Sequence, residues 1–239
     1  MEEKQLKKAP RTAPITISKT VRTGKLLRRG KTARVGRRGL HELEEYYRGV
    51  SGFGMNVIGL TGHATTYGEV TNGGIQTLVE LFKRHAPLSK FTEAQRNCFD
   101  LGCGVGRLVV GIALLVPEIR SYGIEIVPER FRNSQIAISR IHSRSLSSRI
   151  QIRQGNFLDT EISYGSSCWI FVSNLCLTSE TQRSLMERLE KECPPGCVII
   201  CTKDLPLASP SQFERVETGI TVPMTWSATS QCQVYKKKV

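Results

Sequence analysis

The chain has 239 residues, which is enough for one sizeable α/β domain with appendages but not for two large domains. Its net charge of +13 is concentrated at one end, because residues 1–40 hold 13 Lys and Arg against 2 Glu, whereas the remainder holds 21 against 19. The longest apolar run, residues 108–116, has nine residues, about half of what a membrane span needs. We therefore expect no membrane partner.

Residues 1–39 form the basic segment, which contains no aromatic residue. A composition of this kind buries too little apolar surface to offset the entropy of ordering the chain. We therefore predict a disordered tail. The charge favours an arm that binds nucleic acid by displacing counterions, and a leader or targeting segment is the alternative.

Residues 40–92 read as a region of helix and loop. Acidic and aromatic residues at 41–48 predict a short helix, and residues 52–62 are rich in glycine. A longer helix is predicted from the apolar residues Ile75, Leu78, Val79 and Phe82, which follow helical spacing. We expect this region to fold over whatever binds at the glycine-rich turn that follows.

The sequence from 99 to 107, FDLGCGVGR, predicts a strand that ends in an acid and leads into a helix through alternating glycines. Glycines at such a turn let a ligand approach the backbone, and the helix N-terminus attracts negative or polar atoms. The dinucleotide fingerprint requires a third glycine where this chain has Arg107, so a nicotinamide or flavin site fits poorly. An acid such as Asp100 is suited to hold a cationic amine. A purely structural turn is the alternative.

Strands and helices alternate regularly after this turn. Strands are predicted at 119–126, 149–153, 168–173 and 198–202, with a helix starting at Pro128 and another at a capping box formed by Ser179 and Gln182. Residues 219–235 predict an antiparallel hairpin. The predicted fold class is α/β, a doubly wound parallel sheet with a C-terminal antiparallel hairpin and ligands at the carboxyl ends of the strands. The resulting domain covers residues 93–239.

The eight cysteines lie mostly in apolar segments and are expected to be free, buried thiols. Cys193, Cys197 and Cys201 are spaced four apart across a predicted strand, which does not match a zinc knuckle. We therefore predict no metal site.

Two further strand ends carry polar residues suited to a nucleoside. Glu125 ends the strand after the glycine turn, where an acid can accept hydrogen bonds from both ribose hydroxyls. Asn156 and Phe157 follow the next strand, where the amide can bond an adenine amine and the ring can stack on the base. Phe157 as an ordinary core residue is the alternative.

The fourth predicted strand ends at Ser173 and Asn174, two small polar residues between apolar ones. This pattern suits an acceptor channel with apolar walls and a few hydrogen-bonding groups at its mouth. We take Phe171, Val172, Leu175 and Trp226 as candidates for the wall. A helix N-cap at Ser173 and Asn174 is the alternative.

These motifs together resemble one family. Tyr67-Gly68-Glu69, the glycine turn, Tyr122-Gly123-Ile124-Glu125, Gly155-Asn156-Phe157, Phe171-Val172-Ser173-Asn174, Thr202-Lys203 and Thr225-Trp226 occur in the order seen in the histone lysine methyltransferases without a SET domain that are related to disruptor of telomeric silencing. The resemblance covers residues 65–230. It implies the class I methyltransferase fold and a nuclear, monomeric enzyme that moves a methyl group from S-adenosylmethionine to a lysine in the globular core of histone three within nucleosomes, with the basic tail on DNA.

The resemblance also implies site residues. Ser173 and Asn174 would lie beside the methyl group and the lysine amine as the catalytic pair. The cofactor would be bound by residues from five segments of the chain: Tyr67, Glu69, Thr71, Asp100, Gly102, Cys103, Gly104, Gly106, Glu125, Asn156, Phe157, Ser173 and Asn174. The chain departs from the family pattern at Val70, Arg107, Asn156 and Ser173, where a hydroxyl residue, glutamine, aspartate and asparagine are usual.

Two other functions remain open from the sequence. A methyltransferase that grips RNA with its basic arm is the main alternative, and a catalytically silent binding module is the other. The usual enzymes that methylate a nucleobase amine are disfavoured, because Ser173-Asn174-Leu175-Cys176 lacks the proline and aromatic residue that stack a flipped base.

Overall fold

The computed structural model describes residues 32–54 and 67–239, with side chains from residue 39 onward. Most of the predicted tail and most of the glycine-rich loop at 52–62 lie outside these residues. The strands are β1 Asn97–Leu101, β2 Arg120–Glu125, β3 Ile150–Gln154, β4 Ser167–Val172, β5 Val198–Cys201, β6 Phe213–Met224 and β7 Ser227–Lys237. The helices are α1 Thr32–Tyr46, α3 Asn72–His85, α4 Arg107–Leu115, α5 Pro128–Ser139, α6 Arg144–Ser147 and α7 Ser179–Glu192.

The strands of this part of the chain form one sheet in the order β3-β2-β1-β4-β5-β7-β6. Strands β1 to β5 are parallel, and β7 pairs antiparallel with both β5 and β6. The structure thus confirms the doubly wound parallel sheet with a C-terminal antiparallel hairpin. Because β1 and β4 are neighbours at the point where the order reverses, their carboxyl ends flank the crevice where ligands bind in such sheets.

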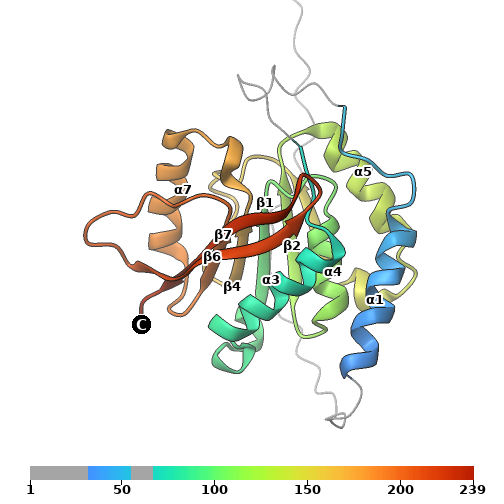
Figure 1. The fold of residues 1–239 in the computed structure, drawn as a ribbon, viewed down its shortest axis with the longest axis horizontal. Coiled ribbons are helices and arrows are strands. Elements are labelled where there is room, and N and C mark those ends of the chain that lie inside the picture. Colours follow the sequence, from blue (N-terminus) through green and yellow to red (C-terminus); the bar gives the residue numbers. More distant parts are fainter. Residues whose placement is uncertain (1–31, 55–66) are drawn as a thin grey trace, which may run out of the picture.

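Helices cover both faces of the sheet, with α7 on one side and α1, α3, α4 and α5 on the other (Figure 1). One core contains the stacked rings of Phe82 and Trp169, whose centroids are 5.0 Å apart. The second core lies under α7 and includes Leu185 and Leu189. Within the described residues, no helix is long and apolar enough to cross a membrane.

Two helices begin where the sequence did not predict. Helix α1 starts at Thr32, so residues 32–39 of the segment predicted to be disordered are helical. The N-cap of α7 is Thr178, whose hydroxyl accepts a hydrogen bond from the backbone N–H of Thr181. The predicted capping residue, Ser179, is the first residue of the helix. Serine and threonine are both favoured at the N-cap, so residue type alone does not show which of the two caps the helix.

Seven of the eight cysteines are free, buried thiols, as predicted. Among the described residues, no group of three or more His, Cys, Asp or Glu side chains is arranged to hold a metal ion.

Candidate functional site

A cavity of about 430 Å³ opens at the carboxyl ends of β1 and β4. It lies between the glycine turn, the segment before α3 and the turn that joins β6 to β7. Most of the predicted site residues line it: Tyr67, Glu69, Asp100, Gly102, Cys103, Gly104, Phe171, Ser173, Leu175 and Trp226. Four segments that are far apart in the sequence therefore meet at one cavity.

The Tyr67-Gly68-Glu69 segment is fastened to the β6–β7 turn. The Glu69 backbone N–H donates to the Thr225 hydroxyl at 2.9 Å, and the Thr225 N–H donates back to the Glu69 carbonyl at 2.8 Å. A side chain at Gly68 would collide with the ring of Trp226. These contacts bring Tyr67 and Trp226, which are far apart in the sequence, to the same wall of the cavity.

The shape of the glycine turn depends on glycines in the left-handed backbone conformation. Gly102 and Gly104 have φ of 81° and 58°, which residues with a side chain adopt only at a cost. A Cβ at Gly104 would lie 2.5 Å from the Tyr67 ring, whereas a Cβ at Gly102 would meet nothing within 4 Å. The Tyr67 hydroxyl accepts from the Val105 N–H at 3.3 Å and donates to Glu69 at 2.8 Å. The turn is therefore a cradle open to a ligand, bordered by Tyr67.

Asp100 is the acid at the end of β1, and its carboxyl group lies at the cavity wall. It is buried, and within the described part of the chain it has no hydrogen-bond or ion-pair partner. Burial, and secondarily the nearby Glu125 carboxyl, raise its pKa to about 8. A buried acid that lacks a partner and faces a cavity fits a cationic ligand group, such as the sulfonium or ammonium of S-adenosylmethionine, the cofactor that the resemblance implies.

Cofactor binding should therefore release a proton below pH 8. Free Asp100 is largely protonated there, and a cation beside it favours the carboxylate, so the affinity should rise with pH and level off above about 8. Calorimetric titrations at pH 7 in two buffers of different ionisation enthalpy measure this release. Asp100→Asn should lose the component that comes from Asp100 and bind more weakly. Equal proton release by both proteins would contradict this position for Asp100.

Glu125, at the end of β2, is buried next to the glycine turn. One carboxyl oxygen accepts from the Gly104 N–H at 2.7 Å, and the other accepts from the Val127 N–H at 2.8 Å. Burial raises its pKa, and these two hydrogen bonds oppose that shift. Glu125 thus holds the backbone of the glycine turn at Gly104. Glu125 is not among the residues that line the cavity, and its contact with the ribose stays a prediction.

Asn174 does not reach the cavity. Its side chain is fully buried, and its oxygen accepts from the Thr202 N–H, the Thr202 hydroxyl and the Lys203 N–H at 3.0, 3.1 and 2.7 Å. Its amide donates to Gln182 at 2.8 Å and to the Lys203 carbonyl at 3.2 Å. All of its hydrogen-bonding capacity is used inside the protein. The predicted catalytic role of Asn174 is therefore corrected to that of a clasp between the ends of β4 and β5.

Three other predicted residues also face away from the cavity. Val172 is buried in the α7 core, because successive residues of a strand point to opposite faces and Phe171 occupies the cavity side. Thr71 caps α3 by accepting from Gly74, and it donates to the Pro223 carbonyl. A side chain at Gly106 would meet Ile152 rather than a ligand.

The structure does not bring Asn156 and Phe157 to the cavity wall. The Asn156 side-chain oxygen accepts from the Leu158 N–H at 2.9 Å and shapes the turn after β3. The half-buried Phe157 ring packs against the α7 core. The contacts of both residues with adenine stay predictions.

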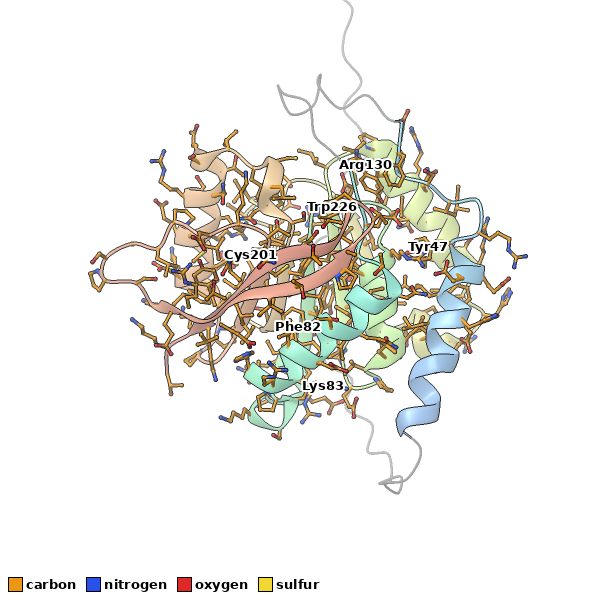
Figure 2. The ribbon with its side chains drawn as sticks, viewed as in Figure 1. Tyr47, Phe82, Lys83, Arg130, Cys201 and Trp226 are labelled. Atoms are coloured by element: carbon orange, nitrogen blue, oxygen red, sulfur yellow. The ribbon has the colours of Figure 1, made fainter. Side chains whose placement is uncertain are left out.

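Sequence reasoning missed two cations at the cavity. The buried guanidinium of Arg130 lies 4.3 Å from the centroid of the Tyr67 ring, and its Nε donates to the Gly52 carbonyl at 3.2 Å. The ammonium of Lys203 donates to the Leu175 carbonyl at 2.6 Å. Figure 2 shows Arg130 and Trp226, which both line the cavity, near the tip of the β6–β7 hairpin. For Lys203, the Thr202-Lys203 motif was a signal in the sequence. For Arg130 there was none, because it resembles any exposed arginine in the first turn of a helix.

Comparison with known proteins fits this geometry. The sequence profile of the family described as "Histone methylation protein DOT1" matches residues 61–239. A protein-lysine N-methyltransferase of Saccharolobus islandicus (strain REY15A) is 30% identical over 122 residues, which is 51% of this chain and 71% of that protein. The family and this relative together support methylation of protein lysine with S-adenosylmethionine as the cofactor.

A solved structure of similar fold is that of the glycopeptide N-methyltransferase MtfA complexed with sinefungin. It matches with a TM-score of 0.50 and 11% identity over 68% of this chain and 85% of that chain, a likeness of fold alone. The sheet order and this likeness establish the class I methyltransferase fold that the resemblance implied. With three quarters of its length matched by the family profile, the chain belongs to the DOT1 family of histone methylation proteins, which are S-adenosylmethionine-dependent methyltransferases.

Proposed function

We propose that this protein is a histone-lysine N-methyltransferase that modifies a lysine in the globular core of histone three within nucleosomes. The observation that carries the proposal is the composition of the cavity. Asp100, which has no side-chain partner among the described residues, lies on the cradle side, while Phe171, Leu175 and Trp226 line the side where an acceptor would enter. Leu175 and Trp226 are 39% and 41% exposed, which suits residues at a cavity mouth.

The residues of the cavity have to prepare a lysine amine for attack. Its ordinary pKa is about 10.4, so in water it is protonated and not nucleophilic near neutral pH. The apolar wall disfavours the ammonium form, and the proton leaves to solvent. When bound, the cofactor supplies an electrophilic methyl group on its sulfonium. We propose that Ser173, which follows β4 and lines the cavity, accepts a hydrogen bond from the neutral amine and so aims the lone pair of the amine along the cavity.

A methyl-transfer assay with nucleosomes, free histone three and total RNA tests the proposal. Labelled methyl groups should appear on histone-three lysine and be strongest with nucleosomes, as mass spectrometry of the digested histone would show. Label on RNA alone would establish the RNA methyltransferase instead. Cofactor binding without transfer to any of the three would favour a silent binding module.

The basic segment gives a second prediction, on nucleosome binding. Residues 1–31 hold ten Lys and Arg against two Glu, and we propose that they bind nucleosomal DNA and that the protein works as a nuclear monomer. Deleting them, with α1 left whole, should weaken nucleosome binding sharply and flatten its salt dependence, because each neutralised phosphate contributes about 0.9 to the slope. The affinity for the cofactor should not change.

A matched control separates charge from sequence. A scrambled tail of equal charge should restore most of the binding, and a tail with glutamine at the ten basic positions should not. Nucleosome affinity and salt dependence that are unaffected by the deletion would reject the DNA role and leave a targeting function for the segment.

A further inference from the structure

Helix α1 lies before residue 61, and so outside the part of the chain that the family profile matches. The residue after its last turn nevertheless contacts the glycine turn. The Tyr47 hydroxyl donates to the Val105 carbonyl at 3.0 Å, and both residues are buried. No other hydrogen bond to the Val105 carbonyl is present within the described residues. A side chain from outside the family region thus satisfies a backbone group of the cofactor cradle.

A second contact runs from the same turn to the same helix. Arg107, the residue after the last glycine, forms an ion pair with Glu44 of α1 and donates to Asn72 at 3.0 Å. Its guanidinium carbon lies 5.7 Å from the centroid of the Tyr47 ring. Arg107 also lines the cavity. Its side chain is only 14% exposed, so the ion pair is partly shielded from water on the arginine side.

The helix itself is fixed in place. Leu40 and Leu43 are buried in the core shared with α4, and a Cβ at Gly111 of α4 would lie 3.4 Å from the Leu43 side chain, which is van der Waals contact. Beyond the helix, Arg140, the C-cap residue of α5, donates to the carbonyls of Tyr46 and Arg48 at 2.8 and 2.7 Å. In Figure 2, Tyr47 lies at the end of α1 that is nearer to Arg130, which lines the cavity. Helix α1 is therefore held in place by its own contacts, and it supports the glycine turn through Tyr47 and Glu44.

We infer that α1 is a working part of the cofactor site, in which Tyr47 and Glu44 are positioning residues that hold the glycine turn in its binding shape through Val105 and Arg107. The inference rests on S-adenosylmethionine binding, not on the histone substrate. It predicts that the cofactor site extends back to Glu44, 17 positions before residue 61, where the family region begins.

Adjacent residues on the same helix provide matched controls. Tyr47→Phe removes only the hydroxyl that reaches the turn, whereas Tyr46→Phe removes one that reaches the exposed Glu42. Glu44→Gln removes the charge facing Arg107, whereas Glu45→Gln removes one that faces Arg48 on the surface. Calorimetry should show about three- to tenfold weaker cofactor binding for Tyr47→Phe, a smaller loss for Glu44→Gln, and affinities within twofold of wild type for both controls.

A merely structural helix gives a different pattern. Tyr47→Phe and Glu44→Gln would then lower the midpoint of thermal unfolding but leave the dissociation constant of the folded protein unchanged, and this result would overturn the inference. Since coupling is reciprocal, bound cofactor should also slow hydrogen exchange at the last amides of α1, and unaltered exchange would count equally against it. If Tyr47→Phe does not fold, Glu44→Gln and the exchange data decide. A wild-type protein that binds no cofactor would overturn the proposed function as well.

Discussion

Replacing Gly104 with valine should abolish S-adenosylmethionine binding. Gly104 has a φ of 58°, and a Cβ there would lie 2.5 Å from the Tyr67 ring, at the edge of the cavity. The valine must either push Tyr67 aside or occupy the space that a ligand needs, and it also strains the turn that Glu125 holds from behind. We expect no measurable heat of binding at cofactor concentrations a hundredfold above the wild-type dissociation constant.

The control for this prediction is Gly49→Val. Gly49 has a similar φ of 71°, but a Cβ there would meet nothing within 4 Å. Both variants incur a left-handed backbone penalty of roughly 1–2 kcal/mol, so both should unfold at a lower temperature. Only Gly104→Val should lose the cofactor. Wild-type binding by a folded Gly104→Val would mean that the turn is structural and that the cofactor cradle lies elsewhere.

The sheet was predictable because its signals are local. Strands β4 and β5 are short, fully buried and mostly apolar runs, and β1 is buried along its whole length. Alternation of strand and helix then restricts the topology to a few arrangements. The sequence predicted a short helix at 41–48, but the first part of α1, residues 32–39, escaped prediction because it is basic. The helix is stabilised by packing of Leu40 and Leu43 further along.

The candidate site was predictable where function constrains the backbone. Gly102, Gly104 and Asp100 form a compact motif whose spacing has a physical reason. The missed and misplaced residues depend on contacts across the sequence. Asn174 is a clasp only because Thr202 and Lys203 lie beside it, 28 and 29 positions away. Tyr47 reaches Val105 over 58 positions. Residue type alone cannot distinguish an amide that faces a ligand from one that is saturated by backbone groups.

Asn174→Ala should destabilise the fold rather than act on turnover alone. The substitution removes the acceptor of the buried Thr202 N–H and hydroxyl and of the partly buried Lys203 N–H. Each buried group that loses its partner costs about 1–3 kcal/mol, so the free energy of unfolding should fall by about 3 kcal/mol or more. Urea unfolding measures this loss, and the cofactor should restore part of it by binding the folded state.

Ser173→Ala is the matched comparison, one residue away on the cavity side. The Ser173 side chain makes no hydrogen bond within the described residues, and it lines the cavity. Its removal should change the free energy of unfolding by less than about 0.5 kcal/mol while lowering the rate of methyl transfer several-fold. The two neighbours should therefore separate, Asn174 acting on stability and Ser173 on catalysis. Asn174→Ala with wild-type stability and little turnover would reverse this assignment, because only direct contact with the reacting groups would then explain the loss.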